Sequence, residues 1–353
     1  MKRFLIILAA VLGTMPLLRC DDYSSDSGMI ATGKVGEILV VCESGIWNSE
    51  IKNYLDTGLT RFIMPYMPDV ATFEIIHKTP ENFTGSHKRT RNTLFITVDP
   101  DHRGDRAKIE KRFDVWADDQ LVVDIIGKDF NQILAVCKAG LTEVHEEFDK
   151  IEWKRIMNRY QETGNGKIDD VLKNRFGINL ALPDGTKLVA NRTNFVRLEF
   201  DNSARPIDFG ADGQDPGTIF TGVMVYQYDY LNDSQMELEQ LLKDRDTMLK
   251  YNAPYEVEGS YMGTQYVDFL YPEGNRAKSA NGDLEGFEMR GMFQFKGSLK
   301  HGPGGAFWAF HFVHPKRKKI VCVSGYVDAP ATTSWTQPLR EVQAVFKSVE
   351  ISK

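Results

Sequence analysis

Apolar positions in the first half of the chain fall into short strand-like runs and segments with helical spacing. Runs rich in β-branched and apolar side chains predict strands at residues 35–42, 72–77, 93–98 and 120–126. A helix is expected to begin at Asn48, whose side chain can cap it, and to run to about Phe62. Pro65 and Pro68 follow it and prevent its continuation.

A longer apolar stripe follows the fourth expected strand. Its members recur at three- and four-residue steps over residues 130–151, which predicts one long helix. Residues 164–166, with the sequence Gly-Asn-Gly, interrupt the helical pattern, and a short helix at residues 168–176 is expected to stop at Gly177. We therefore place a first domain at residues 34–160, a junction at 161–190 and a second domain at 191–353.

The second half is richer in strand patterns. Strands are expected at residues 195–200, 219–230, 261–271, 285–296, 306–314 and 319–327. Ser234 and Glu237 form a capping-box signature for a helix that ends before Pro254, and a last helix is expected at residues 335–349.

In the expected strand at residues 285–296, apolar side chains alternate with polar ones at most positions. The apolar set is Phe287, Met289, Phe293 and Phe295, and the polar set is Glu288, Arg290, Gln294 and Lys296. One apolar face and one wet face are typical of an antiparallel sheet. The sequence thus predicts an α+β fold of two sheet-and-helix layered domains, the second with a largely antiparallel sheet.

The N-terminal segment has the plan of a secretory leader. Lys2 and Arg3 precede an apolar run at residues 4–12, which is too short to span a bilayer. Residues 17–20, with the sequence Leu-Leu-Arg-Cys, resemble a lipobox, in which the cysteine is diacylated, although Arg19 replaces the usual small residue. We expect a signal peptide at residues 1–19, lipidation at Cys20 and a flexible tether at 20–33. The alternative is a secreted protein with an unmodified cysteine.

Charge and cysteine content narrow the class of protein. The formal net charge is -6, and removal of the leader makes it more negative, which argues against nucleic acid or an anionic membrane surface as a partner. Cys42, Cys137 and Cys322 remain once Cys20 is acylated. Because an odd set cannot pair fully and all three lie in apolar patterns, buried free thiols are expected.

No catalytic motif stands out along the chain. The sequence lacks a C-x-x-C pair, a G-x-S-x-G elbow and a phosphate-binding glycine loop. Residues 99–110 approach a calcium-loop spacing, but Arg103 occupies a ligand position, so a polar turn explains them better. We therefore expect no metal and no cofactor, and favour a binding role over an enzymatic one.

The residues leave two alternative functions open. Tyr226, Tyr228 and Tyr230 fall on one face of a strand, where exposed rings would bind a glycan or a peptide. Rings packed beneath a helix would exclude that alternative. The other is a hydrolase, whose site would need a cleft that joins four places in the sequence, namely Asp114, Trp116, Arg290 and the turn that contains Gly304 and Gly305.

Several sequence blocks together resemble a family of uncharacterised Bacteroidota lipoproteins. The blocks are Gly36-Glu37, Asp114-Val115-Trp116-Ala117 with Gln120, residues 226–230, Arg245-Asp246, residues 260–264, Arg290-Gly291, residues 302–307 and residues 325–330. The resemblance implies an envelope lipoprotein and carries no catalytic or binding residues with it. It also implies that Asp21 and Asp22, directly after the lipid cysteine, favour export to the cell surface.

The leading hypothesis combines these points. We expect a non-enzymatic lipoprotein of the cell envelope, anchored in the outer membrane through Cys20 and facing either the periplasm or the exterior. Its partner would be another envelope protein, a glycan or a peptide.

Overall fold

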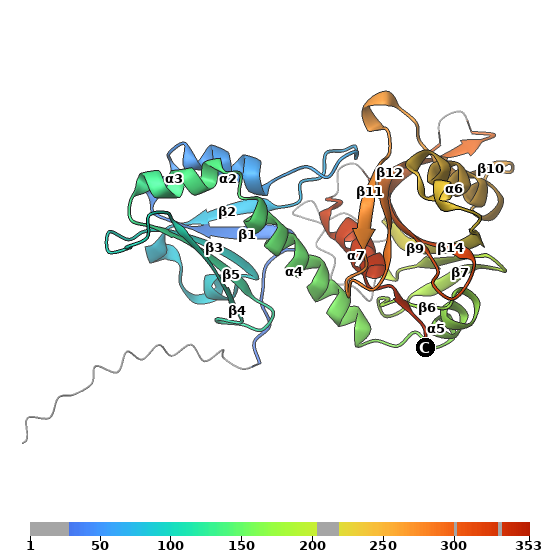
Figure 1. Cartoon of the computed structure of the whole chain (residues 1–353), viewed down its shortest axis with the longest axis horizontal. Helices are drawn as coiled ribbons and strands as arrows, with labels where there is room; N and C mark the ends of the chain where they lie inside the picture. Colours follow the sequence, from blue (N-terminus) through green and yellow to red (C-terminus); the bar gives the residue numbers. More distant parts are fainter. Residues whose placement is uncertain (1–27, 203–218, 300–301, 331–333) are drawn as a thin grey trace, which may run out of the picture.

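The computed structural model describes residues 28–202, 219–299, 302–330 and 334–353, and the expected leader, Cys20 and most of the tether lie outside these ranges. The chain forms two sheet-and-helix domains side by side, joined by a long helix, α4 (Thr142–Gln161) (Figure 1). The predicted α+β class is confirmed, as is the antiparallel sheet of the second domain. Within the described ranges, no helix is long and apolar enough to cross a membrane.

The first domain contains a five-stranded sheet with the order β2-β1-β3-β5-β4. Four strands run parallel, and they are β1 (Glu37–Val41), β2 (Glu74–Lys78), β3 (Asn92–Val98) and β5 (Leu121–Gly127). The fifth, β4 (Lys108–Phe113), pairs antiparallel with β5 at the edge. The helices are α1 (Ser44–Trp47), α2 (Ile51–Leu59) and α3 (Phe130–Lys138), and the apolar faces of α2 and α3 complete a core with the buried strands.

Three details of this domain differ from the sequence prediction. Strand β4 was missed because its sequence is mostly charged, as an exposed edge allows. Asn48 does not cap a long helix, because it lies after α1 and the next helix starts at Ile51. The stripe at 130–151 is two helices, broken where Gly140 and Leu141 have φ of 99° and 51°. The apolar period continues across this break, so it did not reveal the change of direction.

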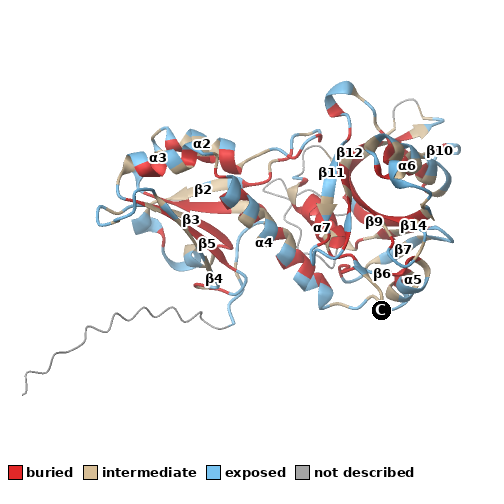
Figure 2. Cartoon of the chain, in the orientation of Figure 1, coloured by how far each residue is buried: buried red, intermediate tan, exposed pale blue. Residues whose placement is uncertain are grey.

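The second domain is built on a curled antiparallel sheet with the order β10-β12-β13-β14-β9-β8-β7, and β11 pairs with the other part of β12. The strands are β7 (Lys187–Arg192), β8 (Phe195–Glu199), β9 (Phe220–Asp229), β10 (Ser260–Thr264), β11 (Glu273–Lys278), β12 (Glu285–Gly297), β13 (Gly304–Val313) and β14 (Lys319–Asp328). Figure 2 shows that its central strands are buried along most of their length. The single strand expected at 261–271 is β10 followed by a 3-10 turn.

Helices cover both faces of this sheet. Helix α6 (Leu238–Asn252) packs on one face, and α7 (Thr336–Lys347) packs on the other together with the end of α4. The wet face predicted for β12 is found in part, because Arg290, Gln294 and Lys296 stay partly exposed whereas Glu288 is covered. Glu288 accepts a hydrogen bond from the indole of Trp308 at 2.7 Å and one from Lys347 at 3.0 Å. Its carboxylate is satisfied by protein partners rather than by water.

The capping box lies two residues earlier than predicted and caps the 3-10 turn before α6, not α6 itself. Asn232 and Gln235 form it, on a 3-10 turn (Asp233–Met236) that precedes the helix. The prediction from Ser234 and Glu237 therefore found the right region with the wrong pair. Asn232 was the better candidate in principle, because asparagine is among the best N-cap residues.

The junction between the domains is helical. After α4, the helix α5 (Lys167–Val171) runs into one π-helical turn (Leu172–Phe176), which ends at Gly177 with φ of 70°. This confirms the predicted glycine cap. The next strand, β6 (Ile178–Asn179), pairs with the C-terminal β15 (Glu350–Ile351) and ties the end of the chain to the junction.

The expected free thiols are confirmed at three positions. Cys42, Cys137 and Cys322 are buried and make no disulfide. Burial raises the pKa of each thiol, to about 11 for Cys42 and to about 12 for the other two. These cysteines are packing residues with little thiolate character at neutral pH.

Candidate functional site

Helix α4 belongs to both domains. Near its start, Val144 and Phe148 pack in the hydrophobic core of the first domain. Near its end, Ile156 and Tyr160 pack in the hydrophobic core of the second domain. One continuous helix therefore fixes the spacing between the domains.

A loop of the first domain enters the second. It connects α2 to β2, and its residues Ile63 and Val70 pack in the core of the second domain. Tyr66, only 1% exposed, donates a hydrogen bond from its hydroxyl to the carbonyl of Phe307 on β13 at 3.0 Å. This loop and α4 bound the space between the domains on two sides.

Helix α7 is buried nearly all round, as Figure 2 shows. Its apolar side chains face the curled sheet, and Arg340 faces the first domain. The guanidinium donates to Asp149 Oδ1 at 2.8 Å and to the carbonyl of Thr72 at 2.9 Å, and it lies 4.8 Å from the centre of the Phe73 ring. The interface is thus held by a buried cation and by apolar packing.

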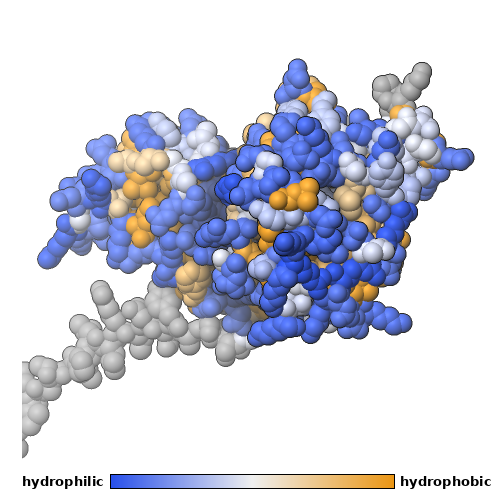
Figure 3. Space-filling model, turned by 45° about the vertical axis from the view of Figure 1, so that its right-hand side comes forward, coloured by the Kyte–Doolittle hydropathy of each residue, from blue (hydrophilic) through white to orange (hydrophobic). Residues whose placement is uncertain are grey.

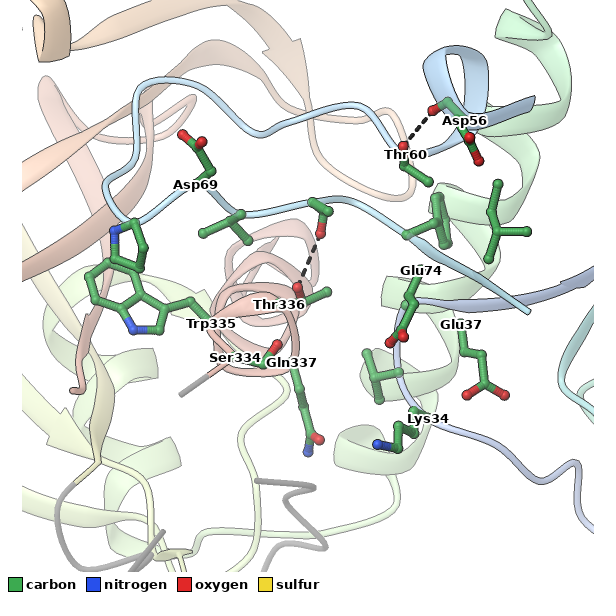
Figure 4. A pocket seen from close by; sticks show the side chains of 17 residues that line it. Lys34, Glu37, Asp56, Thr60, Asp69, Glu74, Ser334, Trp335, Thr336 and Gln337 are labelled. Carbon is green, nitrogen blue, oxygen red and sulfur yellow. Dashed lines mark hydrogen bonds between the residues drawn. The ribbon is translucent and has the colours of Figure 1, made fainter. Parts of the chain in front are cut away.

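A cavity of about 580 Å³ opens between the first domain and the start of α7 (Figure 4). The first domain supplies β1 and the segment before it, the end of α2, the loop and β2. The second supplies Trp335, Thr336 and Gln337. Thr336 donates a hydrogen bond to the carbonyl of Ala71 at 3.1 Å, which closes the floor.

Gly36 lies on the cavity wall in close contact with Thr336. It has φ of 80°, and a Cβ at this position would lie 2.7 Å from the methyl group of Thr336. Glycine is therefore required for both the backbone conformation and the close approach of the two domains.

The cavity wall is predominantly acidic. Glu37 and Glu74 are directly paired in the register of β1 and β2, and Asp56 and Asp69 add two further carboxylates, with Lys34 as the cation on this wall. No histidine or cysteine lines it. Across the described ranges, no group of three or more metal-ligating side chains is placed to hold an ion. This arrangement suits binding of a cationic group better than covalent chemistry.

His145 on α4 lies beside the interface contacts of Thr72. Its Nε2 is 2.9 Å from the Thr72 hydroxyl, and its ring packs edge-on against Phe73. Burial lowers the pKa of His145 to about 4. The nearby Asp149 carboxylate acts to raise this pKa, and the guanidiniums of Arg61 and Arg340 act to lower it. The imidazole is therefore neutral in the folded protein over most of the acidic range.

This pKa shift predicts a pH-dependent stability of the interface. In the unfolded chain the imidazole takes up a proton near pH 6.5, whereas in the fold it does so only near pH 4. Folding stability should therefore fall as pH drops through this window, by roughly 3 kcal/mol from this group. Urea unfolding at pH 7 and pH 4.5 measures the loss.

His145→Gln isolates the contribution of this side chain. Glutamine retains an amide for Thr72 but does not titrate, so the variant should lose clearly less stability between the two pH values than the wild type. Subtracting the two losses removes the contribution of the carboxylates, which titrate in both proteins. Equal losses would show that His145 is not the responsible group.

The structure corrects the predicted tyrosine surface. Tyr226 is fully buried beneath α6, in one core with Leu241 and Leu242. Its hydroxyl lies 3.3 Å from His311 Nε2. Tyr228 and Tyr230 are half-buried against the same core. The three rings therefore do not form an open platform, and a glycan or peptide cannot stack on them.

The residues of the hydrolase alternative lie in different places. Asp114 lines a hollow of about 470 Å³ on the outer edge of the first domain, and Trp116 packs 5.4 Å from Phe83. Arg290 lies in the second domain, with its guanidinium 5.5 Å from the Trp308 ring. The cleft that this alternative requires is not formed by these residues.

Gly304 and Gly305 allow the start of β13 to lie close to its neighbouring strands. A Cβ on Gly305 would lie 2.0 Å from the carbonyl oxygen of Val327, and one on Gly304 would lie 2.3 Å from that of Phe293. Gly304 also borders a cavity between Met67 and Asp328. It therefore lies beside the loop that the first domain inserts into the second.

The residues of the interdomain cavity were not identified from the sequence. Asp69 and Trp335 carry no motif, and they meet only because the loop before β2 packs against the start of α7. One signal was available: residues 62–68, with the sequence Phe-Ile-Met-Pro-Tyr-Met-Pro, form an apolar loop stiffened by two prolines, and such a loop is a candidate for packing against another domain.

Fold and cavity together define a two-domain α+β protein with a cavity between its domains. Residues 31–161 match the domain of unknown function DUF8532, and residues 165–348 match the domain of unknown function DUF4837. Because the second match covers more than half of the chain, the protein belongs to the DUF4837 family. The comparison with curated proteins gives no match.

Solved structures resemble part of the chain. The Ran-binding protein Mog1p of Saccharomyces cerevisiae is 12% identical with a TM-score of 0.30, over 50% of this chain and 90% of that one. A mutant of protein Mog1 is 11% identical with a TM-score of 0.29, over 50% and 92%.

Proposed function

We propose that the chain is a lipid-anchored protein of the bacterial cell envelope, of the Bacteroidota lipoprotein type, which binds another envelope component in the cavity between its domains. The observation that carries the binding role is the cavity itself, because both domains contribute to its wall and buried contacts hold them in place. The anchor rests on the leader and on the lipobox-like residues before Cys20.

The chemistry of the wall favours binding over catalysis. It presents carboxylates, hydroxyls and an amide around an apolar floor that includes Phe73 and Trp335. A nucleophile activated by an adjacent base is not among these side chains, because histidine and cysteine are missing from the wall. Convergent polar groups on an apolar floor are typical of ligand sites.

The anchor is tested in cells that produce the full chain. Globomycin, an inhibitor of lipoprotein signal peptidase, should leave an unprocessed precursor. Cys20→Ala should release the protein from the membrane fraction, whereas Cys42→Ala, which alters a buried thiol, should not. Processing that is unaffected by globomycin, with membrane association retained in Cys20→Ala, would reject the anchor.

The binding role is tested by photo-crosslinking in the same cells. A photoreactive amino acid at Asp69, on the cavity wall, should give a discrete adduct with an envelope component. The same group at Asp170, exposed on α5 outside the cavity, is the matched control and should give none. Absence of an adduct at Asp69, or the same adduct at both positions, would reject the proposal.

A further inference from the structure

The interdomain cavity continues into two more cavities along the end of the curled sheet. Pro68 and Trp335 line both the first cavity and a second one of about 540 Å³. Phe220 and Asp328 line both the second cavity and a third one of about 250 Å³. The shared residues place the three cavities next to one another, from the first domain to the end of β9 and β14, and this set of adjacent cavities is called the trench below.

The middle of this trench is apolar and offers amide groups. Met67 and Phe220 are 58% and 45% exposed and face this middle section. Met292 and Pro303 extend the same surface, and the side-chain amides of Gln265 and Gln294 line it. Flexible methionines suit varied apolar side chains, and amides can both donate to and accept from an extended backbone.

Both ends of the trench are acidic. The wall in the first cavity carries four carboxylates, of which Asp56 is paired with Lys52 on the same helix. The third cavity carries Glu199, Glu256 and Asp328, with Arg197 as the cation of that section. Arg197 is already engaged, since its Nε donates to the Tyr326 hydroxyl at 3.1 Å and its NH2 lies 3.8 Å from Glu199. Carboxylates therefore outnumber cations along the trench.

We propose that the trench binds an extended, basic polypeptide segment of a second envelope protein. This inference rests on the proposed function and specifies its partner. Lysine or arginine side chains of the segment would pair with the two acidic ends, and apolar side chains between them would cover Met67 and Phe220. An extended chain fits because it presents side chains and free backbone groups along its whole length. Charge complementarity of this kind gives specificity and fast association.

The test measures binding of a labelled peptide to the full chain purified in detergent. The probe is a twelve-residue peptide with lysines at both ends and leucines between them, and its counterpart carries glutamate in place of lysine. The lysine peptide should bind, and the glutamate peptide should not. Asp69→Lys and Glu256→Lys, at opposite ends of the trench, should each weaken binding at least tenfold. Asp170→Lys, with the same change in net charge outside the trench, should alter it less than twofold.

Other outcomes overturn the inference. Equal weakening by Asp170→Lys would show attraction to net charge alone, and weakening by only one of the two end variants would show that the trench does not act as one site. Self-association that Met67→Gln abolishes would identify a second copy of the chain as the occupant. An in-cell adduct at Asp69 with a lipid or glycan would overturn the peptide inference and leave the proposed binding role intact, whereas no adduct would remove both.

Discussion

Arg340→Ala should lower the free energy of unfolding by roughly 3–4 kcal/mol, because it removes a buried cation from its partners. The side chain of Arg340 is 1% exposed. Its loss would leave Asp149 and the Thr72 carbonyl without their donor and would open space beside Phe73. Urea unfolding at pH 7 measures the change.

A matched exposed ion pair provides the control for Arg340. Lys52 and Asp56 form an i,i+4 pair on α2 whose side chains are 42% and 39% exposed, so Lys52→Ala should cost less than about 1 kcal/mol. Amide hydrogen exchange locates the effect. In Arg340→Ala, exchange should rise in residues 60–72 and in α7 but not in α6. A loss no larger than that of Lys52→Ala would show that Arg340 does not hold the interface.

Much of the fold could be predicted because each buried strand carries its own local pattern. The four parallel strands of the first domain and the long antiparallel strands of the second are rich in β-branched or alternating apolar residues. What could not be predicted depends on contacts distant in sequence. Leu141 adopts a left-handed conformation because its side chain packs in the first core. Its sequence neighbours give no sign of that contact.

The candidate site was less predictable for the same reason. Alternation correctly placed Tyr226, Tyr228 and Tyr230 on one face of β9, but only the packing of α6 determined that this face is covered. The cavity wall brings together Glu37, Asp69 and Trp335 from distant parts of the chain. Each is an ordinary surface-type or core-type residue in its own sequence context. They come together only because α4 and α7 join the domains.

The centre of α4 provides the second large effect. Glu152 is fully buried, and its Oε1 accepts from Asn92 at 2.6 Å and from Arg155 at 2.9 Å, while Arg91 Nε lies 3.0 Å away. Burial lowers the pKa of Arg155 to about 10, and the Glu152 carboxylate opposes that shift. Glu152→Ala would leave two buried guanidiniums facing each other without a counter-charge. The expected loss of stability is roughly 3–5 kcal/mol, measured by urea unfolding at pH 7.

Two further variants separate charge from shape at this position. Glu152→Gln keeps the size of the side chain and one acceptor oxygen but removes the charge. Its loss of folding stability should therefore be smaller than that of Glu152→Ala but greater than zero. Glu162→Ala, at the exposed end of the same helix, should cost no more than about 0.5 kcal/mol. If Glu152→Gln were as stable as the wild type, the carboxylate would act as a hydrogen-bond acceptor only. Because Glu152 and Arg155 attach α4 to β3, an intermediate value would show that ionic contacts help to hold the helix that joins the two domains.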